Sequence, residues 1–238
     1  MKIGLVAPFE GRYRVMGYEA IYAARLAIRE INASGGVNGV RVELIALDDS
    51  GDPNMAIEQA RKLAIDPQVI AVIGHFRPDT TGEASAAYCA ESLPLLAIDS
   101  DRWGACPVAF ALTLPITTSI SPNPSEFLFF STVSHPADVP DARTFIEAYN
   151  AIPIDGTPPG PIALQTYDAA YLVFDALGRT IQSDGVASRA GMAKALVASD
   201  FAGLGGTYRF DADGSRIGAT VYVYRYGKDR APELIEER

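Results

Sequence analysis

Charged, aromatic and hydroxyl side chains gather in three short segments of this chain, each directly after an apolar run. The segments are residues 9–17, 74–80 and 99–102. Arginine binds a carboxylate through paired hydrogen bonds, and aspartate binds an ammonium group, so together they suit a zwitterion such as an amino acid. The side chains concerned are Glu10, Arg12, Tyr13, Arg14 and Met16; His75, Phe76, Arg77 and Asp79; and Asp99, Ser100, Asp101 and Arg102.

The elements that carry these segments are expected to alternate between strand and helix. Short apolar runs typical of buried parallel strands alternate with stretches that repeat apolar residues at helical spacing. Asp52 followed by Pro53 predicts one helix start, and the capping-box sequence Thr80–Glu83 predicts another. The expected strands are residues 2–7, 40–47, 69–73 and 95–98, and the expected helices are residues 18–34, 53–65 and 80–91.

This alternation predicts an α/β fold with a doubly wound parallel sheet. In such sheets the ligand lies beyond the carboxyl ends of the strands, and all three polar segments arrive at that edge. The second segment also leads into a helix N-terminus, which favours an anion. Any one of these residues taken alone is most simply a solvated loop residue, but the set together predicts a small-molecule site.

The sequence lacks the motifs of nucleotide-binding and hydrolytic sites. No glycine-rich phosphate loop follows the first strand, and no G-x-S-x-G elbow occurs. We therefore interpret Asp48 and Asp49 as solvated strand-end caps, and His75 as a hydrogen-bonded strand-end residue. His135 lies far from His75 in the sequence and neither has a spaced ligand cluster, so no metal or cofactor is expected. The sequence 211–214 is interpreted as a β-turn, because it lacks the later ligands of a calcium loop.

Composition narrows the class of protein and of partner. The chain has 238 residues, 48% of them hydrophobic, a formal net charge of −9 and a pI near 4.7. This acidity argues against nucleic acid or an anionic membrane surface, because both require clustered Lys and Arg. No apolar run approaches the roughly 20 residues of a membrane helix, and no signal-peptide region precedes the first strand.

The two cysteines, Cys89 and Cys106, do not have the spacing of a metal site. They are either buried thiols or one disulfide. We favour thiols, because Cys89 falls on the apolar face of an expected helix.

Several motifs resemble those of one receptor family. The INASGGVNG turn, the DDSGDP segment and the AVIGH strand end are similar to the first lobe of type I periplasmic binding proteins. The likeness is to the Leu/Ile/Val-binding receptors of ABC importers. It resumes in SHPADVPDARTFIEAYN, IALQTYDAAYLVFDALGRTI and GLGGTYRFDADGSRIGATVYVYRY, which resemble the closing section of the same family.

Between these stretches the chain departs from the family pattern. Family members build a second lobe there, whereas a Pro/Ser/Thr-rich linker, residues 115–125, stands here in place of a domain of roughly 100 residues. The resemblance implies a main lobe of residues 1–107 and 137–217, and a reduced β remnant of residues 108–136 and 218–238.

Strands of the remnant are expected at residues 108–114, 127–133 and 220–226. A three-stranded sheet needs a cover on its apolar face. The residues expected to contact the main lobe or another chain are Leu128, Phe130, Tyr222 and Tyr224.

The resemblance also carries the family's ligand contacts onto this sequence. By position they fall on Met16, on Pro78 where a serine is common, and on Asp99 and Asp101 where small or hydroxylated residues are common. Two aspartates repel a carboxylate, so leucine is not assigned, and an amine-bearing solute is compatible. Tyr167 opens a helix that borders the cleft in the family and is a further candidate. The candidate ligand-binding residues are Arg12, Tyr13, Met16, Phe76, Arg77, Pro78, Asp79, Thr80, Asp99, Ser100 and Asp101.

The function that the resemblance implies is that of a non-enzymatic solute receptor, which presents a half-cleft to an amino acid or small amine. The expected partners are this solute, an ABC permease or a sensor protein, and a second copy that closes the half-cleft; nucleic acid is not among them. The expected location is the periplasm or cell surface. The alternative is an interaction or sensor module that has lost solute binding and assembles through its remnant strands.

Overall fold

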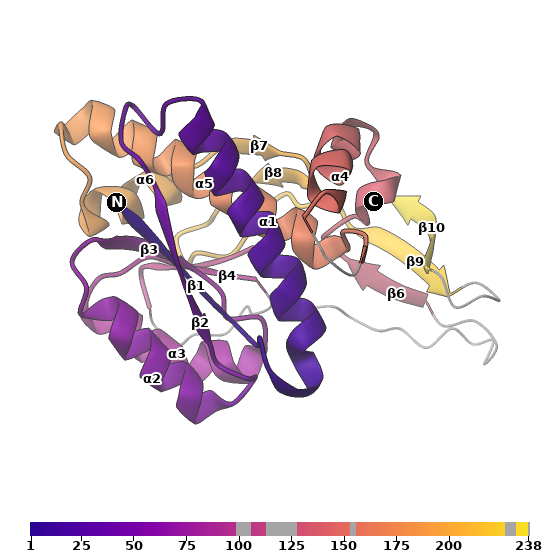
Figure 1. Ribbon diagram of the computed structural model, residues 1–238, viewed down its shortest axis with the longest axis horizontal. Helices are drawn as coiled ribbons and strands as arrows, with labels where there is room; N and C mark the ends of the chain where they lie inside the picture. The colour runs from indigo at the N-terminus through magenta and orange to yellow at the C-terminus, as the bar shows by residue number, and fades with distance from the viewer. Residues whose placement is uncertain (99–105, 113–127, 153–155, 227–231, 238) are drawn as a thin grey trace.

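A five-stranded parallel sheet forms the centre of the molecule, as the sequence predicts. The structure is a computed structural model that describes residues 1–98, 106–112, 128–152, 156–226 and 232–237. The strands in spatial order are β2 (Glu43–Asp48), β1 (Lys2–Ala7), β3 (Val69–Ile73), β4 (Leu95–Ala97) and β5 (Ala109–Ala111). One face is covered by α1 (Arg14–Ala33), α5 (Pro161–Asp184) and α6 (Arg189–Val197), and the other by α2 (Pro53–Ala64) and α3 (Pro78–Ala90) (Figure 1).

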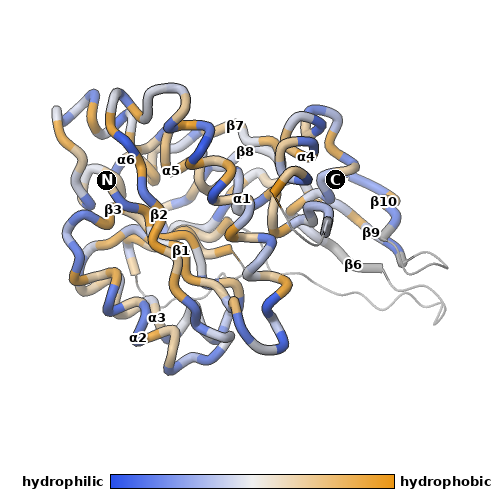
Figure 2. The backbone as a smooth tube through the Cα atoms, viewed as in Figure 1, coloured by the Kyte–Doolittle hydropathy of each residue, from blue (hydrophilic) through white to orange (hydrophobic). Residues whose placement is uncertain are grey.

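Burial on both faces explains why the strands read as apolar runs. All five residues of β3 are buried. Leu5 of β1 packs in the cluster that includes α1 and α5, whereas its neighbour Val6 packs in the cluster that includes α2. Figure 2 shows the hydrophobic stretches gathered in the central strands, with hydrophilic residues along the outer turns. Among the described residues, no helix is both long and apolar enough to cross a bilayer.

Two of the expected helix starts are wrong. Helix α1 begins at Arg14, because the short 3-10 helix η1 (Gly11–Tyr13) runs directly into it. Helix α3 begins at Pro78, and the Thr80 hydroxyl donates to the Arg77 carbonyl at 3.0 Å instead of capping the helix. The expected cap at Asp52 is confirmed, since its carboxylate accepts the backbone N–H groups of the first turn of α2.

A second, antiparallel sheet consists of β10 (Pro232–Glu237), β9 (Tyr222–Tyr226) and β6 (Leu128–Ser131), in that order. The strands expected within 127–133 and 220–226 are confirmed. The assignment of residues 108–114 to this sheet is wrong, because Ala109–Ala111 pair in parallel with β4. Phe110 is fully buried and packs against Phe210, with ring centroids 5.1 Å apart, so this strand belongs to the main core.

Tyr224 of β9 packs inside this chain. Its side chain is 2% exposed. Its hydroxyl accepts the His135 backbone N–H at 2.8 Å and donates to the Asp138 carboxylate at 3.1 Å. These two residues border η2 (Pro136–Asp138), which leads through η3 (Pro140–Ala142) into α4 (Arg143–Asn150). The sequence predicts that Tyr224 contacts either the main lobe or another chain. The contact within this chain is confirmed.

A buried arginine joins the two sheets. Arg216 is 2% exposed, and its guanidinium lies 4.0 Å from the Tyr208 ring centroid. It donates to the carbonyls of Thr207 (3.0 Å), Leu112 (3.1 Å) and Thr132 (3.4 Å). Leu112 follows β5 and Thr132 follows β6, so one side chain ties the ends of strands from both sheets.

The turn at residues 211–214 protects the outer edge of β5. The Asp211 carboxylate accepts the backbone N–H groups of Asp213 and Ser215, which confirms the β-turn interpretation. The carbonyl of Gly214 accepts the Ala111 N–H at 2.8 Å. A Cβ at Gly214 would lie 2.0 Å from the Ala109 carbonyl oxygen, and the φ of +78° also favours glycine there.

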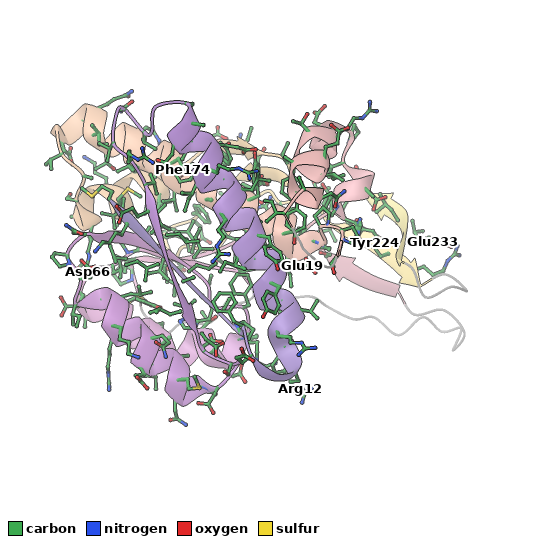
Figure 3. The ribbon with its side chains drawn as sticks, in the orientation of Figure 1. Arg12, Glu19, Asp66, Phe174, Tyr224 and Glu233 are labelled. Atoms are coloured by element: carbon green, nitrogen blue, oxygen red, sulfur yellow. A yellow bond between two sulfur atoms is a disulfide. The ribbon has the colours of Figure 1, made fainter. Side chains whose placement is uncertain are left out.

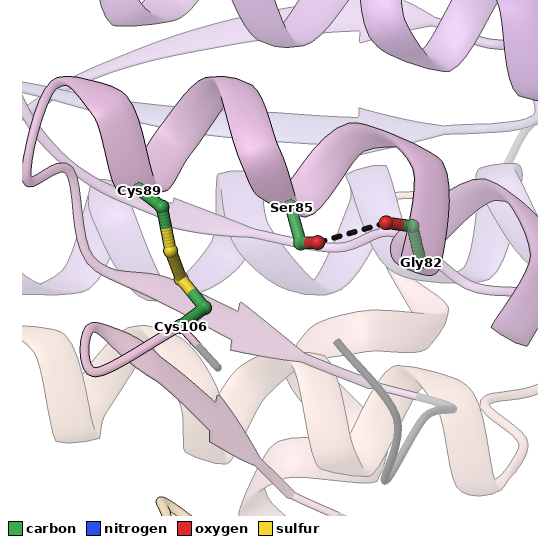
Figure 4. Close-up of a disulfide and its surroundings, with 4 residues drawn as sticks. All are labelled: Gly82, Ser85, Cys89 and Cys106. Atoms are coloured by element: carbon green, nitrogen blue, oxygen red, sulfur yellow. Dashed lines mark hydrogen bonds between the residues drawn. A yellow bond between two sulfur atoms is a disulfide. The ribbon is translucent and has the colours of Figure 1, made fainter. Parts of the chain in front are cut away.

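Cys89 and Cys106 form a disulfide, with Cα atoms 5.7 Å apart, so the expectation of two thiols is wrong (Figure 4). Cys89 lies in the last turn of α3, and Cys106 lies just before β5. The apolar face of α3 therefore contacts the segment that precedes β5. From the sequence, β5 was expected to belong to the antiparallel sheet. A bridge between residues separated by 17 positions stabilises the fold by about 3 kcal/mol through the entropy of the unfolded chain.

A buried carboxylate holds the hairpin of β7 (Phe201–Gly203) and β8 (Gly206–Tyr208) against α5. Asp168 is 1% exposed and accepts the N–H groups of Leu204 (2.8 Å) and Gly205 (2.7 Å) and the Tyr208 hydroxyl (3.0 Å). Burial raises the pKa of Asp168 from 3.8 to about 6, and the three hydrogen bonds and the charge of Arg216 oppose that rise.

We expect this carboxyl to make the fold more stable at pH 5 than at pH 7. A pKa that is higher in the folded state means that the folded chain takes up a proton first, so stability falls as pH rises through about 6. The contribution of this group between pH 7 and pH 5 is about 1 kcal/mol. Urea unfolding at both pH values measures it. Asp168→Asn should remove that part of the pH dependence, and an unchanged difference in the variant would contradict the assignment.

Candidate functional site

The loops after β1, β2 and β3 converge at the carboxyl edge of the parallel sheet. Tyr13 of η1 lies among them, with the Arg12 guanidinium 4.7 Å and the Arg77 guanidinium 4.1 Å from its ring centroid. Gly51 of the β2–α2 loop lies against the same ring, since a Cβ there would come within 2.7 Å of it. Residues from the loops after β1, β2 and β3 thus meet at Tyr13. The sequence predicts this meeting for segments 9–17 and 74–80 but not for the β2–α2 loop. The third predicted segment, residues 99–102, lies outside the described residues.

Arg77 and Asp79 form an ion pair at this edge. Their nearest side-chain atoms are 2.7 Å apart, and the side chains are 25% and 46% exposed. The hydrogen bond from Arg77 lowers the pKa of Asp79 below its usual value of 3.8. Asp79 also accepts the Thr80 N–H at 3.0 Å, so it occupies part of the anion-attracting start of α3. A solute carboxylate would have to displace Asp79 from Arg77, whereas a solute ammonium can join Asp79 directly.

The other candidates differ in accessibility. Arg12 and Pro78 are exposed, and Met16 is partly buried against the main core. Phe76 and Thr80 are buried, so their side chains anchor the β3–α3 loop from inside rather than facing solvent. The candidates Asp99, Ser100 and Asp101 lie outside the described residues.

A series of buried, hydrogen-bonded polar side chains supports these loops from the interior of the protein. Asp49 and His75 are both fully buried, with Oδ2 of Asp49 2.6 Å from Nδ1 of His75. Nε2 of His75 lies 3.0 Å from the Tyr88 hydroxyl of α3, and burial raises the pKa of Tyr88 well above its usual value. The interpretation of His75 as a hydrogen-bonded strand-end residue is confirmed. The expectation that Asp49 is solvated is wrong, because it pairs with His75 under the loop.

Asp48, the neighbour of Asp49, caps the first loop. Its Oδ1 accepts the backbone N–H groups of Phe9 at 2.7 Å and Ser50 at 2.9 Å. The Ser50 hydroxyl donates to its Oδ2 at 2.7 Å. The capping role expected for Asp48 is confirmed, and this carboxylate connects the ends of β1 and β2.

Helix α5 supplies two buried polar residues near this edge that the sequence reasoning missed. Gln165 donates from Nε2 to the Ile98 carbonyl at the end of β4, at 3.3 Å. Thr166 is fully buried, and within the described part of the chain its hydroxyl has no hydrogen-bond partner. The sequence feature that could have revealed them is that Gln165 and Thr166 are two adjacent polar residues in an otherwise apolar stretch of the helix. Tyr167 donates instead to Glu30 of α1 at 2.6 Å, away from the three loops.

Metal chemistry is not indicated in the part of the chain that the structure describes. No group of three or more His, Cys, Asp or Glu side chains is arranged there to hold an ion. The two histidines have separate tasks, since His75 is buried at the end of β3 and His135 caps η2. The arrangement at the sheet edge offers guanidinium, carboxylate and aromatic groups, which can bind a small solute.

The two histidines also make a matched pair of variants. His75→Ala removes the hydrogen-bond partner of Oδ2 of the buried Asp49 and of the Tyr88 hydroxyl, and should lower the free energy of unfolding by about 3 kcal/mol. His135→Ala removes only a cap, from which we expect a loss of about 1 kcal/mol. Urea unfolding of both variants checks this. If both variants lose the same small amount of unfolding free energy, the contacts among Asp49, His75 and Tyr88 do not stabilise the loops.

Comparison with known proteins places the fold. The sequence model of the periplasmic binding protein family matches residues 1–123. An amino acid binding protein of Pseudomonas aeruginosa is 36% identical over 86 residues, which are 36% of this chain and 23% of that protein. A Leu/Ile/Val-binding protein homolog of Brucella abortus is 38% identical over 86 residues, with the same two shares. The match thus spans about a quarter of the length of the curated relatives.

Solved receptor structures align with nearly the whole chain. LivJ of Streptococcus pneumoniae, a branched-chain amino acid transporter substrate-binding protein in complex with isoleucine, has a TM-score of 0.80 at 18% identity over 99% of both chains. The leucine-binding protein LivK of Thermotoga maritima has a TM-score of 0.79 at 14% identity, over 100% of this chain and 98% of that one. These identities establish the fold alone. Because the family match covers more than half of the sequence, this chain belongs to the periplasmic binding protein family.

Proposed function

We propose that this chain is a solute receptor of the amino-acid-binding type, which presents a half-cleft at the carboxyl ends of β1, β2 and β3. Periplasmic binding proteins are non-enzymatic solute-binding proteins of ABC transporters. The observation that carries the proposal is the meeting of Arg12, Arg77 and Asp79 around Tyr13. The family's location supports a periplasmic or cell-surface setting for this chain.

The chemistry of the edge favours a solute that bears an amine. Asp79 is 46% exposed and keeps a low pKa, so it is ionised and open to an ammonium group. The Tyr13 ring stacks on the guanidinium groups of Arg12 and Arg77. A solute carboxylate would compete with Asp79 for Arg77, whereas Arg12 is exposed at the rim. A solute-binding protein of Rhodopseudomonas palustris with a similar fold was solved in complex with benzoate. The fold alone therefore does not determine that the solute is an amino acid.

The half-cleft rests on the division of the chain into a main lobe, residues 1–107 and 137–217, and a smaller β part. This division remains part of the proposal, with β5 moved to the main lobe. A single lobe leaves a ligand exposed on one side, whereas small-molecule sites normally bury most of their ligand. Weak binding is therefore expected unless a second copy closes over the site. An ABC permease or a sensor protein is the proposed downstream partner.

The alternative, assembly through the antiparallel sheet, has one observation in its favour. Ile235 of β10 is 47% exposed. However, the same strand exposes Glu233, Glu236 and Glu237, and like charges along an edge strand oppose pairing with another chain. Tyr224 is also buried within this chain. We therefore rank solute binding first.

Calorimetric titration with leucine, isoleucine, valine and small amines tests the proposal. We expect binding in the high micromolar to millimolar range, and Arg77→Gln should weaken the binding of amino acids about tenfold or more, because it removes a charge-assisted hydrogen bond. Arg61→Gln on α2 is the matched control and should bind like the wild type. Flat titrations at millimolar solute, or equal affinity in Arg77→Gln, would refute the proposal.

Oligomeric state is read from the same samples. Sedimentation with and without solute shows whether a second copy joins on binding. Tight binding by a strict monomer would contradict the half-cleft, and a dimer that forms without any solute binding would favour the alternative function.

A further inference from the structure

A cavity lies beside the first turns of α1 and the end of α4. It has a volume of about 290 Å³. Its α1 residues recur at intervals of three and four, which places them on one face of the helix. Figure 3 shows Glu19 about midway along α1, toward the start of α5, while Arg12 lies at the beginning of the helix. The lining residues are Arg14, Val15, Tyr18, Glu19, Tyr22, Tyr149 and Thr157.

Aromatic rings form the walls of this cavity. Tyr18 and Tyr22 stack with ring centroids 6.1 Å apart, and Tyr22 meets Tyr149 of α4 edge to face at 6.2 Å. Tyr18 is 43% exposed and Val15 is 60% exposed. These two side chains leave an apolar wall open to a solute.

Opposite charges lie within the same cavity without pairing. Among the described residues, neither Glu19 nor Arg14 has an ion-pair partner within 4.0 Å. The Glu19 carboxylate instead accepts the Ala163 N–H at 3.3 Å, at the start of α5. Burial raises the pKa of Glu19, although hydrogen bonds from Ala163 and Gly160 oppose the rise. A bound cationic group would compensate this partly desolvated carboxylate.

We propose that this cavity is a second solute site, which binds an α-amino acid with an aromatic or large apolar side chain. The ammonium group pairs with Glu19, the carboxylate pairs with Arg14, and the side chain packs on Tyr18, Tyr22 and Val15. The volume is at the lower limit of small-molecule pockets, which fits a single amino acid rather than a larger ligand. Glu19 and the tyrosine faces both favour an ammonium group. This site is separate from the half-cleft and does not depend on it.

The test is calorimetric titration of the full chain with L-phenylalanine. Glu19→Gln keeps an oxygen that accepts the Ala163 N–H but removes the charge, so it should weaken binding at this site about tenfold or more. Glu147→Gln removes an exposed carboxylate from α4 and should leave affinity unchanged. Tyr18→Ala alters an exposed side chain and should also weaken binding.

Two further arms separate the possible outcomes. Phenethylamine lacks the carboxylate, so Arg14→Gln should weaken L-phenylalanine but not phenethylamine. Arg77→Gln should leave the binding of L-phenylalanine at this cavity intact, which distinguishes it from the half-cleft. The proposal is overturned if the wild type does not bind L-phenylalanine, if Glu19→Gln and Tyr18→Ala bind like the wild type, or if Arg77→Gln alone abolishes binding.

Discussion

The contact between Asp49 and His75 is the constraint on which the carboxyl edge of the parallel sheet, the proposed solute site, depends. Both side chains are fully buried, and 2.6 Å separates their polar atoms. Asp49 follows β2 and His75 follows β3, so the contact ties together two loops separated by 26 positions in the sequence. A contact between His75 and the Tyr88 hydroxyl extends this series of buried polar side chains to α3. A buried polar group that loses its partner is costly, and the loops above it are therefore held in one arrangement.

Because the loops after β2 and β3 are held together, residues from three loops can contact the Tyr13 ring. Asp48 fixes the start of the first loop by accepting the Phe9 N–H, and Gly51 lets the Tyr13 ring approach the second loop closely. Arg77 then reaches the ring from the third loop. Between the two sheets, Arg216 has a comparable role, since its carbonyl contacts tie the parallel sheet to the antiparallel one. Buried polar side chains thus position both the loops at the carboxyl edge of the parallel sheet and the junction between the two sheets.

Local patterns in the sequence predicted the parts of the fold that local physics determines. The apolar pentad Val69–Ile73 and the Asp52 cap depend on neighbouring residues alone, and both are as expected. The fifth strand and the Cys89–Cys106 bridge depend on contacts between distant segments, so periodicity could not reveal them. Loss of the capping box has a local cause instead, because Pro78 starts the helix two residues before Thr80 and places the threonines inside its first turn.

The candidate site divides in the same way. The contact between the loops after β1 and β3 follows from the rule for parallel sheets. The approach of Gly51 to Tyr13 was not predicted, and the predicted segment 99–102 lies outside the described residues. The burial of Phe76 and Thr80 depends on how the β3–α3 loop enters the core, which no pattern of residue types shows. The cavity beside Glu19 was missed because it forms between α1 and α4, two helices more than 100 positions apart.

The central claim is that solute binds at the carboxyl edge of the parallel sheet. The most direct measurement is amide chemical-shift mapping by NMR while leucine or a small amine is added to saturation. The account predicts shifts at Tyr13, Gly51, Arg77 and Asp79, which come from all three loops. Saturating solute that leaves these four amides unchanged, while amides of β9 and β10 shift, would contradict it.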